Sequence, residues 1–466
     1  MDMFAIINLV DLGIGFAITL NMYKPLADND TDKIGALVRL SGKVHVFIAT
    51  LVLAVGLLLM LTLPFIMKNP PDIPEKFQTI FLLYLLQNVF MYLLVYKRSV
   101  FHADQKEYII DIYFKIFNFI QFIAQIIVLV TTRNFLLYLS TQVACTTLMH
   151  FMIAKKAEKM YPCIKQKSAY KIKKEEIAEI ISNVKSTALY RAGSTALLGT
   201  DSLIISAIVG IDILGLCSNY TLIVVSIKTL TDKAMEAFSA SIGNLHVNAD
   251  KESSEDIFNQ VFFISFWILG FLSIGLAVCL NSLIFVWLNE SFVLSQWIVI
   301  ALVLRFYVQG TQYAPFAFRS TSGLLKYKRF IPIITAAVNI SLSFVFGYFS
   351  GVAGIFFASS LAVFFFTIIP EVNLLYKHKF KKSSLPFFIR YFLYLLFMVV
   401  NYIIINAVLS RLTFTGWTGF FLKVILCALI SIMLFLIVFH RDKNFRIVYS
   451  RIVYLINEMR NKTNES

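Results

Sequence analysis

Polar and charged side chains recur at helical spacing inside otherwise apolar stretches of the sequence. The clearest set advances by four, three, three and four residues and so lies on one face of a helix: Asp111, Lys115, Asn118, Gln121 and Gln125. Ammonium and amide groups in such a row can bind an anionic or polar ligand. Ionisable groups within a membrane usually face a protein interior or a water-filled cavity. We therefore predict that this face does not meet lipid.

Three other apolar stretches carry similar stripes. They contain Asn8, Asp11, Gly15 and Thr19; then Arg191, Ser194, Asp201, Ser202 and Ser206; and finally Arg305, Gln309 and Gln312. Together the four stripes predict one hydrated cavity shared by two groups of helices. Other interpretations stay open: the amides could join neighbouring helices, Lys115 and Arg191 could reach the headgroups, and Arg305 could pair with an acidic neighbour.

The apolar stretches that must position these residues are long enough to cross a bilayer. The chain of 466 residues is 58% hydrophobic and 15% charged, which is too apolar for a soluble globular protein. A single segment surrounded by lipid can form all of its backbone hydrogen bonds only as a helix. The sequence therefore predicts an all-α polytopic membrane protein with about 13 transmembrane helices. The predicted spans are residues 4–20, 44–67, 77–96, 109–130, 135–154, 187–209, 214–230, 261–280, 294–313, 330–349, 352–369, 391–409 and 420–439.

The spans form a first group of five, a second group of six after a polar, lysine-rich stretch, and a final pair. The predicted divisions are an N-terminal lobe at 1–154, a basic cytoplasmic connector at 155–186, a C-terminal lobe at 187–376, a terminal pair at 385–440 and a cytoplasmic tail at 441–466.

Lysine and arginine are concentrated in alternate connections between the spans. By the positive-inside rule, the loops 24–43, 97–106, 155–185, 326–329 and 377–390 face the cytoplasm together with the tail. The net charge of +15 is thus explained by membrane topology, and nucleic-acid binding is not indicated. An odd number of spans leaves the N-terminus outside, and no signal-peptide pattern follows Met1. We therefore expect that a preceding helix is missing from the sequence.

Residue patterns typical of enzymes and metal sites are weak. The five cysteines have no paired spacing, the six histidines are scattered, and no nucleophile-and-base set is recognisable. The outward loops are too short to hold a catalytic domain. We expect neither enzyme activity nor a metal or cofactor, although a membrane-embedded polysaccharide polymerase or glycosyltransferase remains an alternative.

Two stretches of the chain carry motifs of a known family. The first runs from Asp11-Leu12-Gly13-Ile14-Gly15 through Met22-Tyr23-Lys24-Pro25-Leu26-Ala27 to Asp32-Lys33-Ile34. The second comprises Gly199-Thr200-Asp201, Ile204-Ile205-Ser206, Gly215, Ser218-Asn219-Tyr220 and Ser241-Ile242-Gly243-Asn244-Leu245. With these motifs the chain resembles bacterial Wzx-type polysaccharide flippases of the multidrug/oligosaccharidyl-lipid/polysaccharide exporter (MOP, MATE-like) superfamily. That family has fourteen helices in two six-helix lobes plus a final pair. The resemblance therefore implies two pseudo-symmetric lobes and a terminal helix pair here, and also that this sequence lacks the first helix.

The resemblance implies transport of undecaprenyl-diphosphate-linked oligosaccharide units, for O-antigen, lipopolysaccharide or capsule, across the bacterial cytoplasmic membrane by alternating access. We predict Arg305, Arg191 and Lys115 as partners of the diphosphate, with Gln309, Asn118 and Gln125 beside them. Asp201 and Asp11 are candidates for pairing these cations or for carrying a coupling proton or sodium ion. The expected partners are the lipid-linked oligosaccharide, membrane lipids, a polysaccharide polymerase and glycosyltransferases, and the expected state is a monomer. A multidrug antiporter of the same superfamily is the main alternative.

Overall fold

The computed structural model describes most of the chain as helices. The described residues are 18–19, 21–66, 77–104, 106–165, 170, 172, 176–177, 199–247, 251–322, 324, 330–447 and 450, and they contain no strand. The chain divides into two compact units, Met1–Leu203 and Ile204–Ser466. Within the described residues, nine helices are long and apolar enough to cross a membrane. The prediction of an all-α polytopic membrane protein is confirmed.

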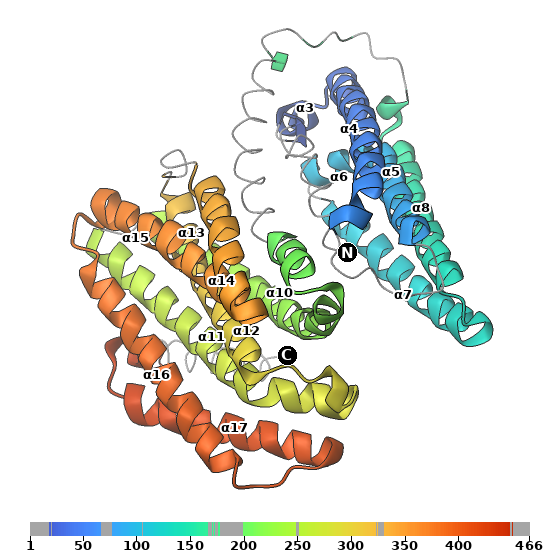
Figure 1. Ribbon diagram of the computed structural model, residues 1–466. Coiled ribbons are helices and arrows are strands. Elements are labelled where there is room, and N and C mark those ends of the chain that lie inside the picture. The colour runs from blue at the N-terminus through green and yellow to red at the C-terminus, as the bar shows by residue number, and fades with distance from the viewer. Residues whose placement is uncertain are drawn as a thin grey trace, which may run out of the picture. The chain divides into compact units, whose positions relative to one another are not determined.

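Unit 1 is built from helices that match four of the predicted spans (Figure 1). Its elements are α3 (Tyr23–Ala27), α4 (Thr31–Ile66), α5 (Phe77–Val95), the 3-10 helix η2 (Tyr96–Arg98), α6 (Ser99–Ala103), α7 (Glu107–Thr132), α8 (Phe135–Met160) and the 3-10 helix η3 (Pro162–Ile164). Helix α5 packs between α4 and α8, and α7 packs against α8. The predicted span 4–20 lies almost entirely outside the described residues.

Unit 2 contains the remaining long helices. A short apolar helix, Gly199–Ile208, includes the boundary between the units. It is followed by α10 (Ile211–Val247), α11 (Lys251–Trp287), η4 (Glu290–Phe292), α12 (Gln296–Thr311), α13 (Tyr313–Thr321), α14 (Ile331–Val363), the π-helix η6 (Phe364–Ile368), α15 (Ile369–Leu375), the π-helix η7 (Tyr376–Phe380), α16 (Leu385–Leu409) and α17 (Gly416–Phe439).

A glycine separates two predicted spans within α14. Gly351 has φ 58° and ψ −140°, which interrupts the helix at the predicted gap between residues 349 and 352. Backbone with positive φ favours glycine because no Cβ is present to clash. Gly354 also has a packing reason, since a Cβ there would lie 2.1 Å from the carbonyl oxygen of Phe346. The chain can therefore turn tightly at this point.

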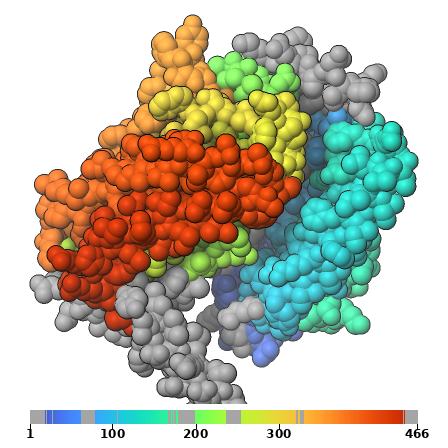
Figure 2. Space-filling view, turned by 90° about the horizontal axis from the view of Figure 1, so that it is seen from below, coloured from blue at the N-terminus to red at the C-terminus, as the bar shows by residue number. Residues whose placement is uncertain are grey.

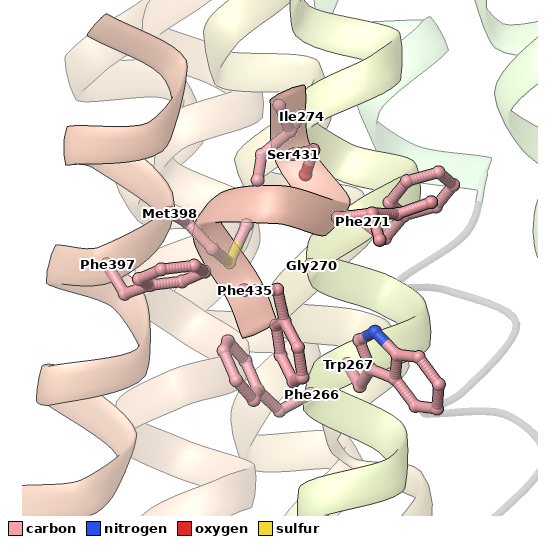
Figure 3. Close-up of a pocket in the computed structure, with 10 residues that line it drawn as sticks. Phe266, Trp267, Gly270, Phe271, Ile274, Phe397, Met398, Ser431 and Phe435 are labelled. Carbon is pink, nitrogen blue, oxygen red and sulfur yellow. The ribbon is translucent and has the colours of Figure 1, made fainter. Parts of the chain in front are cut away.

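Aromatic rings join the C-terminal helices to α11. Phe266 stacks on Tyr394 of α16 with ring centroids 3.9 Å apart, and Phe435 of α17 lies 6.0 Å from Phe266. The seam is closed, because the cavity that remains between these helices is about 10 Å³ (Figure 3), no more than the roughly 10–15 Å³ that one water needs. Helices α16 and α17, orange to red in Figure 2, are therefore an integral part of unit 2.

Candidate functional site

The stripe on α7 changes from exposed to buried along the helix. Asp111, Lys115 and Asn118 are exposed, Gln121 is half-buried, and Gln125 is only 3% exposed. At a rise of 1.5 Å per residue, Asn118 lies about 16 Å from the start of α7 at Glu107, close to the middle of the helix. The structure thus places a charged and amide-bearing surface on a helix that is apolar enough to span a membrane.

The inner end of the stripe belongs to a network of amides. Gln125 Nε2 donates to the Tyr138 carbonyl oxygen at 3.4 Å and to Gln142 Oε1 at 3.5 Å, both on α8. Gln142 in turn donates to Gln87 Oε1 on α5 at 3.4 Å, and Gln121 donates to Gln125 at 3.3 Å. The amide network therefore joins three helices of unit 1, α5, α7 and α8, and a role for Gln125 in binding stays a prediction.

The predicted cation of unit 2 lies on α12. The Arg305 guanidinium is half-buried, and its carbon lies 5.5 Å from the centroid of the Phe356 ring on α14. Such stacking holds a cation in an apolar setting without neutralising its charge. Gln309, one turn further along α12, is also half-buried. The stripe on α12 thus keeps both of its proposed ligand-binding groups at the edge of the core.

Of the other predicted residues, only some lie within the part of the chain that the structure describes. Asp201 lies in the helix Gly199–Ile208 and is 2% exposed. Arg191, Ser194 and Asp11 lie outside the described residues, so their roles remain predictions. Within the described residues, no group of three or more His, Cys, Asp or Glu side chains is arranged to hold a metal ion.

A buried ion pair in unit 2 was missed by the sequence analysis. Arg319 Nη1 lies 3.1 Å from Glu371 Oε1, and both side chains are 2% exposed. The predicted spans ended before each of these residues, at 313 and 369, so both were assigned to connections. A signal was present: each charge stands beside an apolar run, in Tyr313–Thr321 and in the segment that continues through Ile369–Leu375.

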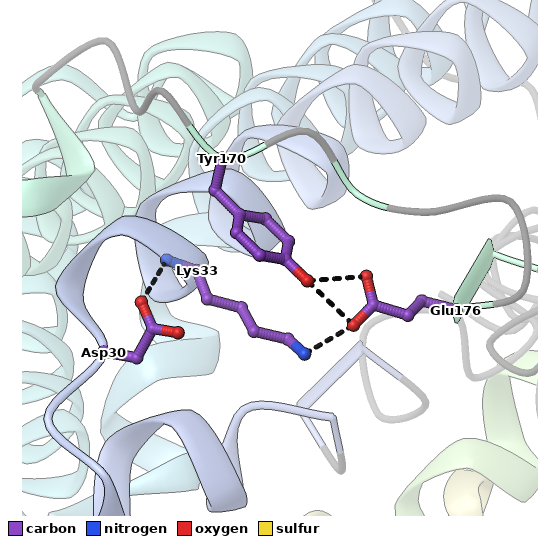
Figure 4. A network of polar contacts seen from close by, with 4 residues as sticks. All are labelled: Asp30, Lys33, Tyr170 and Glu176. Carbon is purple, nitrogen blue, oxygen red and sulfur yellow. Dashed lines mark hydrogen bonds and ion pairs between the residues drawn. The ribbon is translucent and has the colours of Figure 1, made fainter.

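Three connections predicted to face the same side meet at one end of unit 1. Lys33, at the start of α4, donates to Glu176 Oε1 at 2.5 Å, and the Tyr170 hydroxyl donates to both oxygens of Glu176 at 3.0 Å (Figure 4). Lys97 of η2 pairs with Glu158 near the end of α8 at 2.5 Å. The loops 24–43, 97–106 and 155–185 are therefore neighbours in space, as their predicted common side requires.

At the same end of unit 1, contacts with Lys106 and Tyr161 change the pKa of the Asp104 carboxyl. Partial burial opposes ionisation of the Asp104 carboxyl, but hydrogen bonds from Lys106 and Tyr161 outweigh it and lower its pKa. Burial, followed by the hydrogen bond to Asp104, raises the pKa of the Tyr161 hydroxyl. Asp104 and Tyr161 thus link the connection before α7 to the segment that follows α8.

Solved structures of membrane transporters share this fold. The lipid II flippase MurJ, in an inward closed conformation, matches with a TM-score of 0.62 and 17% identity over 94% of this chain and 98% of that chain. An inward-facing multidrug resistance MATE family transporter of the MOP superfamily matches with a TM-score of 0.61 and 9% identity over 80% and 89%. A MATE transporter from Vibrio cholerae matches with a TM-score of 0.55 and 12% identity over 81% and 87%.

These likenesses show that the chain shares the fold of these three proteins. None of the three proteins is described as an enzyme. No protein-family model and no curated protein matches the sequence.

Proposed function

We propose that this protein moves undecaprenyl-diphosphate-linked oligosaccharide units across the bacterial cytoplasmic membrane by alternating access. The cargo would supply a cell-surface polysaccharide such as O-antigen or capsule. Glycosyltransferases would build it, and a polysaccharide polymerase would consume it. The protein would act as a multi-pass monomer with its C-terminal tail in the cytoplasm.

One observation carries the proposal: the exposed polar face of α7. Lys115 and Asn118 lie well inside a helix of spanning length, and neither is covered within unit 1. A lysine facing hydrocarbon at that depth would be costly, so the face requires water or a polar ligand. A diphosphate attached to sugars is such a ligand. The diphosphate oxygens accept charge-assisted hydrogen bonds, and the sugar hydroxyls hydrogen-bond with amides.

The cations favour an anionic cargo over a cationic drug. Arg305 and Lys115 stand in stripes with the amides Gln309 and Asn118, and we assign Arg191 to the same anion-binding role. Guanidinium groups bind phosphate oxygens through two parallel hydrogen bonds. A multidrug antiporter remains the second candidate, because the MATE fold matches with nearly the same TM-score as MurJ.

Transport of a fluorescent undecaprenyl-diphosphate-linked oligosaccharide in proteoliposomes tests the function directly. Arg305→Glu should reduce the rate at least about tenfold, because a hydrogen bond to a charged group contributes about 1.5–3 kcal/mol. Arg411→Glu, an exposed charge in the α16–α17 connection, is the matched control and should stay near the wild-type rate. Normal transport by Arg305→Glu would remove Arg305 from the site. Efflux of a cationic dye without movement of the lipid-linked sugar would favour the antiporter.

Labelling with a membrane-impermeant maleimide tests the polar face of α7. In a background without the five native cysteines, a cysteine at Asn118 should react, whereas one at the adjacent Phe119 should not, since its side chain is 66% exposed on the apolar face. A cysteine at Gln309 should react as well. If Asn118 and Gln309 positions were both as unreactive as position 119, no polar chamber would exist.

The coupling ion is assigned to Asp201, with Asp11 as the second candidate. Asp201 is buried, and burial disfavours a carboxylate charge. A proton or sodium ion bound there would neutralise that charge. Vesicles containing Asp201→Asn should lose the part of transport that an ion gradient drives, while transport without a gradient persists. Undiminished coupling in this variant would exclude Asp201.

A further inference from the structure

The buried pair of Arg319 and Glu371 includes none of the residues assigned a role above. Arg319 is in the last turn of α13, and Glu371 is in the first turn of α15. These two short helices pack against each other within unit 2. The single close contact, Nη1 to Oε1 at 3.1 Å, joins two side chains that are each 98% buried, as their exposed fraction of 2% shows.

The pair leaves several buried polar atoms without hydrogen bonds. Arg319 Nε and Nη1 and Glu371 Oε2 are fully covered and have no hydrogen-bond partner. A buried ion pair offsets its desolvation only when the geometry is good and the remaining donors and acceptors are satisfied. This pair meets neither condition. The ionised state of Glu371 is therefore held weakly.

Arg319 keeps other stabilising contacts when the carboxylate is neutralised. Its guanidinium carbon lies 5.9 Å from the centroid of the Phe316 ring. Its position in the last turn of α13 also places it near the negative end of the helix dipole. Guanidinium does not lose its proton in proteins. Glu371 is consequently the member of the pair that changes charge.

The backbone around Glu371 has a rare form on both sides. The π-helices η6 and η7 directly precede and follow α15. Thr367 of η6 hydrogen-bonds through its hydroxyl to Thr335 of α14 at 2.9 Å. Single π-turns inside helices occur frequently at functional sites, because they permit a local change of register. Helix α15 is thus bounded by two points at which its register can shift.

Several charged groups on the surrounding elements pair with other residues. On α11, Glu255 pairs with Lys382, and Asp256 pairs with Lys443. On α10, Lys228 pairs with Asp232. Further charged or titratable groups on these elements include Asp212, Cys217, Tyr220 and Lys233 on α10, Cys279 on α11, Arg305 and Tyr307 on α12, Tyr313 on α13, Tyr348 on α14, Tyr376, Lys377, His378 and Lys379 on η7, and Arg390, Tyr391, Tyr394 and Tyr402 on α16. Among the described residues, Glu371 forms an ion pair with Arg319 alone.

We propose that Glu371 is a proton-binding site whose protonation releases Arg319 and with it the contact between α13 and α15. The proton adds to Oε2, the oxygen without a hydrogen bond. One O–H bond forms there and one breaks in a hydronium ion, which leaves as water. The net charge of the pair changes from zero to +1, and its ion pair is lost. That this proton drives transport rests on the proposed function, whereas the binding of the proton does not.

Infrared difference spectroscopy of the purified protein in lipid nanodiscs tests the site without any cargo. When the pH is lowered from about 9 to about 5, wild-type protein should gain the C=O stretching band of a neutral carboxylic acid. The amplitude of this band should follow the titration curve of a single proton. Incorporation of ¹³C-labelled glutamate should shift that band, which excludes Asp201 and the other aspartates as its source. Glu371→Gln should abolish the band, and the matched control Glu255→Gln should retain it.

A second variant keeps the test decisive if Glu371→Gln does not fold. Arg319→Met removes the cation that favours the ionised carboxylate, so its band should be present at both pH values. A band that is absent from wild-type protein, or one that persists in Glu371→Gln, overturns the proposal. So does an unchanged pH dependence in Arg319→Met.

Transport assays then separate this inference from the proposed function. If the band behaves as expected and wild-type proteoliposomes do not move the lipid-linked oligosaccharide, the cargo assignment fails and the proton site stands. If they do move it, Glu371→Gln should lose the acceleration produced by a pH gradient even though Asp201 is intact, because both carboxyl groups are then needed for coupling. Retention of that acceleration, with the band lost, overturns the link between the Glu371 proton and transport.

Discussion

Helices α7 of unit 1 and α14 of unit 2 are both of spanning length, but they are covered to very different extents. Helix α7 buries three residues, whereas α14 buries sixteen. Unit 1 leaves a polar face open and holds its helices together partly through amides, while unit 2 is packed around aromatic rings and a charge pair. Both proposals start from this difference: ligand contacts are proposed for the open polar face of unit 1, and a protonation-dependent change is proposed for the buried ion pair of unit 2.

The two units should differ most in the stability that each loses when an aromatic ring is removed. Phe266→Ala deletes a ring that is 1% exposed and stacked on Tyr394, and it should lower the free energy of unfolding by about 3–5 kcal/mol. Phe122→Ala, on the open surface of α7 at 63% exposure, should change it by less than about 0.5 kcal/mol. Apparent melting temperatures in one detergent give both values. Equal losses would mean that unit 1 is packed as tightly as unit 2.

The turn within α14 should be the next most sensitive feature. Gly354→Ala would place a Cβ 2.1 Å from a backbone oxygen, which cannot rotate away, so we expect a loss of about 3 kcal/mol. Gly275→Ala is the matched control, because nothing lies within 4 Å of its Cβ position. The same melting measurement should show the control unchanged or slightly more stable. Tolerance of Gly354→Ala would contradict the close approach at this turn.

Two residues of one stripe on α7 should behave differently. Gln125→Leu removes hydrogen bonds that join helices and should cost about 1 kcal/mol of stability. Asn118→Leu, which is exposed, should leave stability within about 0.5 kcal/mol but slow transport of the lipid-linked oligosaccharide. Melting and transport assays of both variants resolve the two roles. If Asn118→Leu were as destabilised as Gln125→Leu and transported normally, the whole stripe would be structural.

Sequence alone could predict features that depend on local pattern. Apolar length placed the spans, and the interruption at Gly351 falls in the two-residue gap between spans 330–349 and 352–369. The spacing on α7 identified a helical face. It could not distinguish Gln125 from Asn118, because both obey the same periodicity and only the packing of α8 separates them.

Partnerships between distant residues were beyond such reasoning. Arg319 and Glu371 are far apart in the chain, and their contact depends on how α13 and α15 pack after the turn at Gly351. The predicted spans ended at Tyr313 and Ile369, before each of these residues, so both were assigned to connections. In the structure, helical residues continue past both ends, in α13 and α15.

The smallest expected effect lies at the end of unit 1 where Asp104 contacts Lys106 and Tyr161. Lys106 and Tyr161 lower the pKa of Asp104 below its ordinary value of 3.8, so the ionised carboxylate stabilises the folded protein above that pH. The contribution should be lost as the pH falls through the lowered folded-state value. Asp104→Asn should therefore reduce the melting temperature near pH 7, and the reduction should shrink as the pH falls further below 3.8. Because the Asp104 side chain is 31% exposed and solvent screens its contacts, the difference at neutral pH should correspond to about 0.2–1 kcal/mol and should shrink in high salt. Asp28→Asn, at an exposed carboxylate outside the ion pairs of the described residues, is the control and should show no such pH dependence. If both variants behaved alike, the polar contacts at this end would contribute nothing to holding the connections of unit 1 together.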